Sequence, residues 1–148
     1  MDQDAFRKTY REVNEVFCAF EKSVLTNECR CSKSERFCIA EREGVHCGSD
    51  AAQKQCLELL ELIRHHSRFA LKAREAQSAL PHNKAMRVQV GGLRGLHTSL
   101  HPGVGIPSPI ADIDALVETA VARFGSLDAL PFGNIVKQIT AYRGRRPF

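Results

Sequence analysis

Apolar side chains in the first part of the chain recur with the period of an α-helix. Six of them are separated alternately by four and three residues, so they fall on one face of a helix. They are Phe6, Tyr10, Val13, Phe17, Phe20 and Val24. Most charged residues of the segment lie off this face. The pattern predicts one amphipathic helix over residues 4–27, with Cys18 beside its apolar face.

A second apolar face of helical period begins after Ser49 and Asp50, either of which can cap the start of a helix. It continues to residue 79, and Pro81 then ends it. The face comprises Ala52, Cys56, Leu59, Leu60, Ile63, Ala70 and Ala73. Two long helices joined by a compact connector are expected to pack antiparallel. The sequence therefore predicts an N-terminal antiparallel helical hairpin.

The connector between these helices, residues 28–48, is rich in cysteine. Within it, residues 34–43 are expected to form a short helix that begins at Ser34 and stops at Gly44. Gly44 and Gly48 mark turns on either side of Cys47.

From residue 81 onward the pattern changes, because four prolines and five glycines fall between residues 79 and 111. So many breakers predict a Gly/Pro-rich arm over residues 81–110 without a long regular element. Apolar residues at helical spacing then predict a small helical pair at 111–124 and 134–142. We expect a mostly α fold in three parts: a Cys-bearing hairpin (1–80), the arm (81–110) and a small basic helical segment (111–148).

Hydropathy and charge indicate the cellular location of the protein and the kinds of partner it binds. No stretch approaches the roughly 18 apolar residues of a membrane span, and the acidic start lacks the apolar region of a signal peptide. These features predict a cytoplasmic protein with no membrane span. Residues 79–148 hold 8 basic and 4 acidic residues, which accounts for the net charge of +4. Three arginines in the tail are typical of a solubilising terminus, so nucleic-acid binding is not expected.

The six cysteines all lie between residues 18 and 56, and clustered thiols in a reducing compartment are commonly metal ligands. Zinc takes four ligands, and iron–sulfur clusters are generally held by four thiolates. The all-cysteine donor set favours an iron–sulfur cluster, with zinc as the alternative. Cys18 and Cys56 are expected in the helical core, although Cys56 can substitute for a ligand. The predicted metal ligands are Cys29, Cys31, Cys38 and Cys47.

Disulfides are a second interpretation of the same residues. In an antiparallel hairpin, Cys18 and Cys56 lie at similar distances from the connector, as do Cys29 and Cys47. Bridges between these two pairs are compatible with one register. The arrangement is similar to that of the twin C-x9-C coiled-coil–helix proteins of mitochondria, although the gaps here are ten and eight residues.

The sequence contains no Ser-His-Asp set, paired catalytic carboxylates or cofactor fingerprint, which argues against an autonomous enzyme. His97 and His101 have a metal-chelating spacing, but Pro102 and nearby glycines argue against a helix there. We therefore expect a small metal-binding accessory protein for electron transfer, sensing or assembly of a larger complex. Residues 81–148 would contact the larger protein partner. The alternative is a non-enzymatic interaction module whose cysteines form structural zinc sites or disulfides.

Overall fold

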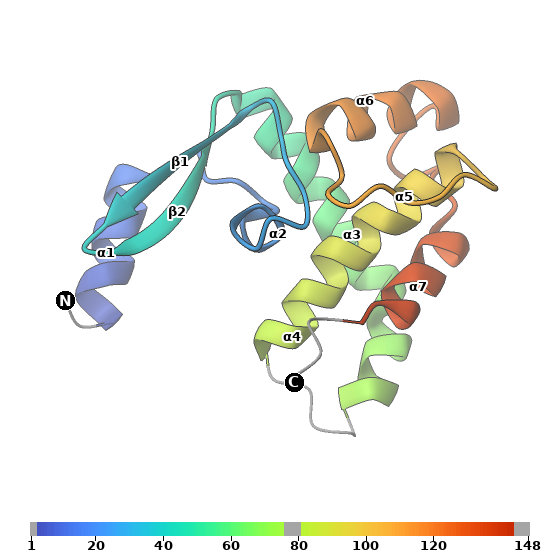
Figure 1. Cartoon of the computed structure of the whole chain (residues 1–148), viewed down its shortest axis with the longest axis horizontal. Coiled ribbons are helices and arrows are strands. Elements are labelled where there is room, and N and C mark those ends of the chain that lie inside the picture. The colour runs from blue at the N-terminus through green and yellow to red at the C-terminus, as the bar shows by residue number, and fades with distance from the viewer. Residues whose placement is uncertain (1–2, 76–80, 144–148) are drawn as a thin grey trace.

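The structure, a computed structural model, describes residues 3–75 and 81–143 (Figure 1). This part of the chain contains eight helical segments and a small two-stranded sheet, which lies beside α1 at one side of the molecule. In chain order they are α1 (Gln3–Val13), α2 (Glu21–Leu25), β1 (Ser34–Ile39), β2 (Arg42–Cys47), α3 (Asp50–Glu75), α4 (Pro81–Met86), the π-helix η1 (Arg87–Gly91), α5 (Gly92–Leu100), α6 (Ile113–Phe124) and α7 (Phe132–Ala141).

The expected first long helix is interrupted at Asn14. This side chain is 2 % exposed, and its amide donates hydrogen bonds of 3.0 Å to the Tyr10 hydroxyl and to the Val45 carbonyl. Beyond Asn14 the chain extends and pairs with β2 through the bridge Phe17↔His46. The backbone groups of residues 16–18 thus bond to a strand, and helical structure returns only at α2.

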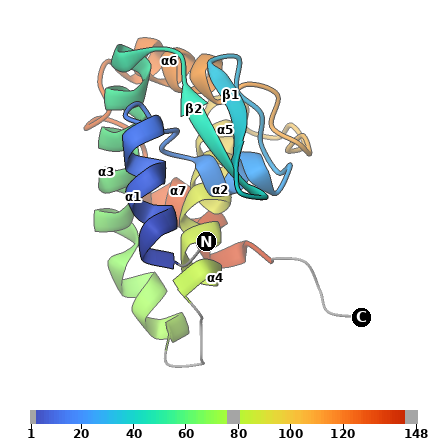
Figure 2. The same ribbon diagram turned by 90° about the vertical axis from the view of Figure 1, so that its left-hand side faces the viewer.

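Residues 34–47 form an antiparallel β-hairpin, so the short helix predicted at 34–43 is wrong. The register pairs Ile39 with Arg42 and leaves Ala40 and Glu41 as a two-residue turn. Both turn residues have positive φ, 47° and 73°, as a type I′ turn requires. The predicted antiparallel helical hairpin is therefore also wrong: a broken first helix and a β-hairpin precede α3 (Figure 2).

The predicted arm is helical over most of its length, since α4, η1 and α5 follow one another from Pro81 to Leu100 without a break. Two of its glycines, Gly91 and Gly95, lie inside this helical stretch where α7 crosses against it. A Cβ at Gly91 would lie 2.7 Å from the Cα of Ile139. These two glycines thus permit a close helix contact, whereas the breakers from Pro102 to Pro109 lie in the irregular segment after α5.

The predicted helices at 111–124 and 134–142 are present as α6 and α7. The second long helix is present as α3 to Glu75, and its predicted end at residue 79 lies outside the described residues.

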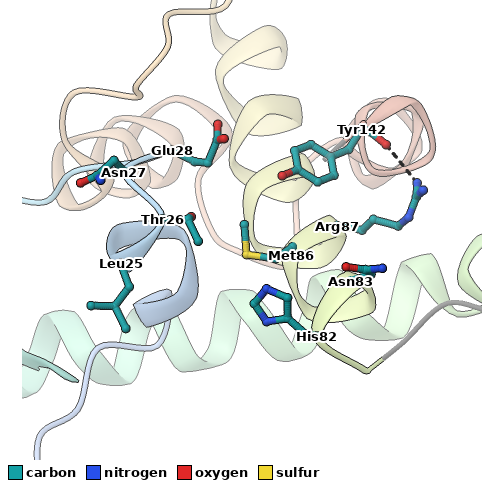
Figure 3. A pocket seen from close by; sticks show the side chains of 9 residues that line it. All are labelled: Leu25, Thr26, Asn27, Glu28, His82, Asn83, Met86, Arg87 and Tyr142. Carbon is teal, nitrogen blue, oxygen red and sulfur yellow. Dashed lines mark hydrogen bonds between the residues drawn. The ribbon is translucent and has the colours of Figure 1, made fainter. Parts of the chain in front are cut away.

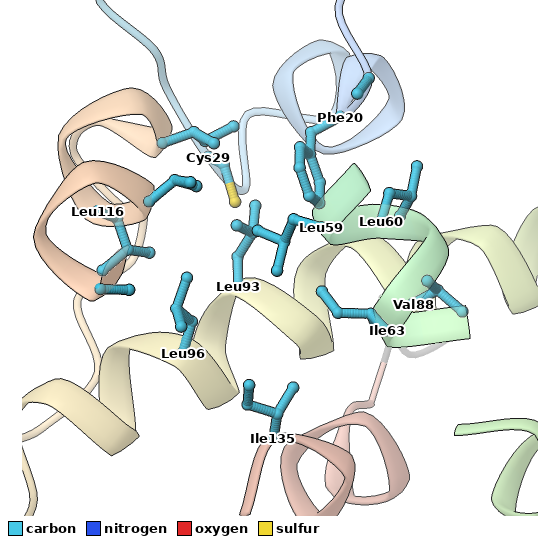
Figure 4. Close-up of a cluster of buried hydrophobic side chains, with 14 of the residues drawn as sticks. Phe20, Cys29, Leu59, Leu60, Ile63, Val88, Leu93, Leu96, Leu116 and Ile135 are labelled. Carbon is cyan, nitrogen blue, oxygen red and sulfur yellow. The ribbon is translucent and has the colours of Figure 1, made fainter. Parts of the chain in front are cut away.

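A hydrophobic core joins α2, β2, α3, η1, α5, α6 and α7. Figure 4 shows its centre, where Leu93 and Leu96 of α5 lie between Ile63 of α3 and Leu116 of α6. The division into 1–80, 81–110 and 111–148 stays a prediction. None of the helices in the described ranges combines the length and apolar character needed to cross a lipid bilayer.

Candidate functional site

The pairing of residues 16–18 with β2 brings Cys18 and Cys47 to the same face of these paired strands. The Cys18 amide donates to the Val45 carbonyl at 2.9 Å, and the Cys47 amide donates to the Val16 carbonyl at 2.7 Å. Side chains alternate along paired strands, so Cys18 and Cys47 lie on the face opposite Phe17. Val45 and Cys47 are buried, whereas Phe17 is 37 % exposed, which fits this orientation.

Cys31 is held next to Cys47 by a turn before β1. Ser34, the strand partner of Cys47, donates to the Cys31 carbonyl from its amide at 3.2 Å and from its hydroxyl at 2.8 Å. The Gly48 amide donates to the Lys33 carbonyl at 2.7 Å. These bonds fix the turn around Cys31 against the end of β2.

The first turns of α3 place Cys56 beside the same segments. The Ser49 hydroxyl accepts a hydrogen bond of 3.2 Å from the Ala52 amide at the start of the helix. One turn before Cys56, the Gln53 side chain donates to the Phe17 carbonyl at 3.2 Å. Residues three apart share a helix face, so Cys56 lies over the segment that carries Cys18.

Mutual electrostatic effects on their pKa values also indicate that these four cysteines lie near one another. Burial raises the pKa of Cys56 to about 12, with smaller contributions from Cys18, Cys31 and Cys47. Burial likewise raises the pKa of Cys18 to about 12, with contributions from Cys31 and Cys47. We call Cys18, Cys31, Cys47 and Cys56 the cysteine quartet.

Backbone amides donate hydrogen bonds to two sulfurs of the quartet. The Phe20 amide reaches the Cys18 sulfur, and the Lys33 amide reaches the Cys31 sulfur, in each case from two residues further along the chain. Cys31 also accepts from the Asp114 amide in the first turn of α6. Such bonds favour the thiolate form and so oppose the effect of burial on the pKa of these thiols.

The start of α6 reaches Cys31 because residues 28–30 pair in parallel with residues 110–113. The Arg30 amide donates to the Ile110 carbonyl and the Ile113 amide donates to the Arg30 carbonyl, both at 2.8 Å. This pairing also brings the carboxylate of Asp114, which is 7 % exposed, close enough to raise the pKa values of Cys31 and Cys56. Sequence reasoning missed Asp114, because no local signal links it to a cysteine 83 residues earlier.

The structure separates the four predicted ligands. Cys31 and Cys47 belong to the quartet, as does the predicted substitute Cys56. Cys29 is fully buried in the core, where Figure 4 shows it between Phe20, Leu93 and Leu116. Burial raises the pKa of its thiol to about 11, and its charged neighbours are Arg94 and Glu28.

Cys38 is exposed on β1, opposite Glu43. All six cysteines carry free thiols. Over residues 3–75 and 81–143, no three His, Cys, Asp or Glu side chains stand in a ready metal-coordinating arrangement. The predicted ligand set stays a prediction, while the geometry favours the quartet as the place where thiols converge.

No protein-family model matches the chain, and neither a curated protein nor a solved structure shows significant similarity to it.

Proposed function

We propose that the cysteine quartet holds a metal centre and that the chain is a small metal-binding accessory protein. The observation that carries the proposal is the convergence of four thiols from four separate segments. Each segment is fixed by backbone or side-chain hydrogen bonds, and two of the sulfurs accept backbone amide bonds.

A metal accounts for the chemistry of this cluster better than four neutral thiols do. Four cysteines match the ligand count of a closed tetrahedral site or of an iron–sulfur cluster. A bound cation deprotonates its thiol ligands and offsets their mutual repulsion and the cost of their burial. Amide bonds to sulfur orient the ligands and tune the bound metal. As the donors are all thiols, we favour an iron–sulfur cluster, with zinc as the alternative.

The position of the quartet suggests what such a centre does. It joins the segment before α2, the turn before β1, the end of β2 and the first turns of α3, and it contacts α6 through Asp114. Metal binding would stabilise the N-terminal region against the helices. We further propose a cytoplasmic accessory role in electron transfer, sensing or assembly, with residues 81–148 facing the larger protein partner.

The test is metal and sulfide analysis of the full chain purified without oxygen. An iron–sulfur centre gives a brown protein with bound iron and acid-labile sulfide, whereas stoichiometric zinc in a colourless protein supports the zinc form. Correctly folded protein without metal, after reconstitution with either metal, would refute the proposal.

Single Cys→Ser variants identify the ligands. We expect Cys18→Ser and Cys56→Ser to lose the metal and Cys38→Ser, on the exposed strand, to retain it. Loss of metal in Cys38→Ser with retention in Cys18→Ser would instead support the set predicted from sequence.

A further inference from the structure

Two histidine rings lie side by side at the C-terminal end of α5, which points away from β1 and β2 (Figure 1). The ring centres of His97 and His101 are 4.9 Å apart, and the ring planes are tilted by 48°. A separation of four residues is that of a metal-chelating pair on a helix, but Pro102 argued against a helix here. The structure removes this objection, because α5 continues to Leu100 and the His101 amide donates to the His97 carbonyl at 2.9 Å.

The packing of α5 brings both rings to the same side of the helix. Leu96 and Leu100, each one residue before a histidine, are buried in the hydrophobic core. Adjacent residues differ by about 100° around a helix, so His97 and His101 lie together at the flank of the buried face. His97 is partly buried there, and His101 is exposed.

Hydrogen bonds hold the end of α5 in place. The Val104 amide donates to the His101 carbonyl at 3.2 Å and closes a turn after the helix. Nη1 of Arg123, from α6, donates to the Leu100 carbonyl at 2.9 Å. Carbonyl groups at the C-terminal end of a helix favour cations, and the bond from Arg123 is one example at this end.

One nitrogen of the pair lacks a partner. Within the described ranges, Nδ1 of His97 is buried and makes no hydrogen bond. A buried polar atom without a partner is costly and uncommon, so no protein acceptor fixes the tautomer of this ring. Because neutral imidazole binds a metal through either nitrogen, the ring is available as a ligand.

We propose that His97 and His101 chelate a divalent transition-metal ion at the end of α5. Imidazole nitrogens suit zinc, nickel and copper. A zinc ion about 2.0–2.1 Å from one nitrogen of each ring places the ring centres roughly 5 Å apart at a tetrahedral angle. The observed separation of 4.9 Å agrees with this geometry.

The ion at this site would be exchangeable. Over residues 3–75 and 81–143, no third His, Cys, Asp or Glu completes a coordinating group with the pair. Structural zinc sites have four protein ligands, so here the remaining positions are open to water or to a donor from another molecule. The site uses no cysteine and is independent of the metal centre proposed at the quartet.

The test is a titration of the full chain with zinc chloride, followed by proton–nitrogen correlation NMR of the histidine rings. We expect the ring signals of His97 and His101 to shift together and to saturate. His101→Gln, at an exposed position, should weaken zinc binding at His97 at least about tenfold, because a chelate becomes a single-ligand site. His97→Gln should weaken binding at His101 to the same extent.

His82→Gln is the matched control. His82 is exposed on α4, in the wall of a cavity between α2, α4 and the end of α7 (Figure 3), and its replacement should leave the zinc affinity of the pair unchanged. Zinc bound by the quartet shifts cysteine signals instead of these ring signals, so each of the two sites can fail alone. Ring signals of His97 and His101 that stay fixed in excess zinc, or an unchanged affinity in His101→Gln, would overturn the proposal.

Discussion

Gly95 of α5 lies directly against the backbone of Ile135 in α7, and a Cβ at position 95 would stand 2.6 Å from the Ile135 Cα. Real Cβ atoms do not approach a backbone carbon so closely. Even the smallest side chain would therefore push the two helices apart.

We expect Gly95→Ala to lower the free energy of unfolding by about 2 kcal/mol or more through overpacking. The matched control is Gly133→Ala in α7. No heavy atom of a neighbouring element in the described ranges lies within 4 Å of a Cβ there. That change should be neutral or stabilise by about 0.5–1 kcal/mol, since alanine favours the helix. Urea denaturation measures both, and similar values for the two variants would contradict the close contact.

Asn14 should be important for the folding of the N-terminal region. Its side chain bonds the Tyr10 hydroxyl and the Val45 carbonyl, and its Oδ1 lies 3.2 Å from Nδ1 of His46. Asn14→Leu leaves these buried groups without a partner and should cost about 2–3 kcal/mol in thermal or urea unfolding. Val13→Thr, at a neighbouring side chain that is 61 % exposed, should change stability little. Equal effects would show that Asn14 does not link α1 to the sheet.

Thiol alkylation at pH 8 should distinguish Cys38 from Cys29. Only the thiolate reacts, and burial raises the pKa of Cys29 to about 11 and removes it from solvent. Cys38 is exposed and should be modified first, whereas Cys29 should react only after unfolding in urea. Mass spectrometry of the peptides after timed labelling checks the order. Fast labelling of Cys29 in the folded protein would place it outside the core.

Stability should decrease in mildly acidic solution because of His97. Burial, with a contribution from His101, lowers the pKa of His97 from its usual 6.5. As the pH falls below 6.5, the unfolded chain therefore binds a proton that the folded chain does not, and the free energy of unfolding falls. The loss ends once the pH is below the lowered pKa.

Urea titrations between pH 7.5 and 5 measure this dependence. His97→Gln should reduce the slope relative to the parent protein, and His82→Gln, at an exposed position, should leave it unchanged. A slope that survives in His97→Gln would assign the pH dependence to other groups.

A helix can be predicted from the sequence where apolar residues of helical period are bounded by a glycine or a proline. α6 is followed by Gly125 and α7 is preceded by Pro131, and both carry their apolar residues on one side. The N-terminal region is different, because Phe17 continues the helical period although its segment pairs with a strand and its side chain is 37 % exposed. The spacing of apolar residues alone does not distinguish a continued helix from an extended segment that pairs with a strand. The hairpin was missed because its turn, Ala40-Glu41, lacks the usual Asn-Gly or Asp-Gly pair.

The candidate site depends even more on tertiary contacts. Cys18 joins the other thiols only because residues 16–18 pair with β2, and Cys31 reaches Asp114 only through the pairing with residues 110–113. Neither contact follows from spacing along the chain. Residue type alone led to the predicted ligands Cys29, Cys31, Cys38 and Cys47, with Cys56 as a possible substitute, and that set stays a prediction.

The pairing of residues 28–32 with residues 110–113 also affects how the protein forms during synthesis. The Ser32 amide bonds the Asp112 carboxylate at 3.0 Å across 80 residues of sequence. At about 5–20 residues per second, a ribosome needs roughly 4–16 s to make that intervening stretch. Cys31 thus emerges well before the Asp114 amide that donates to its sulfur, and the quartet acquires its full surroundings only after the start of α6 has been made.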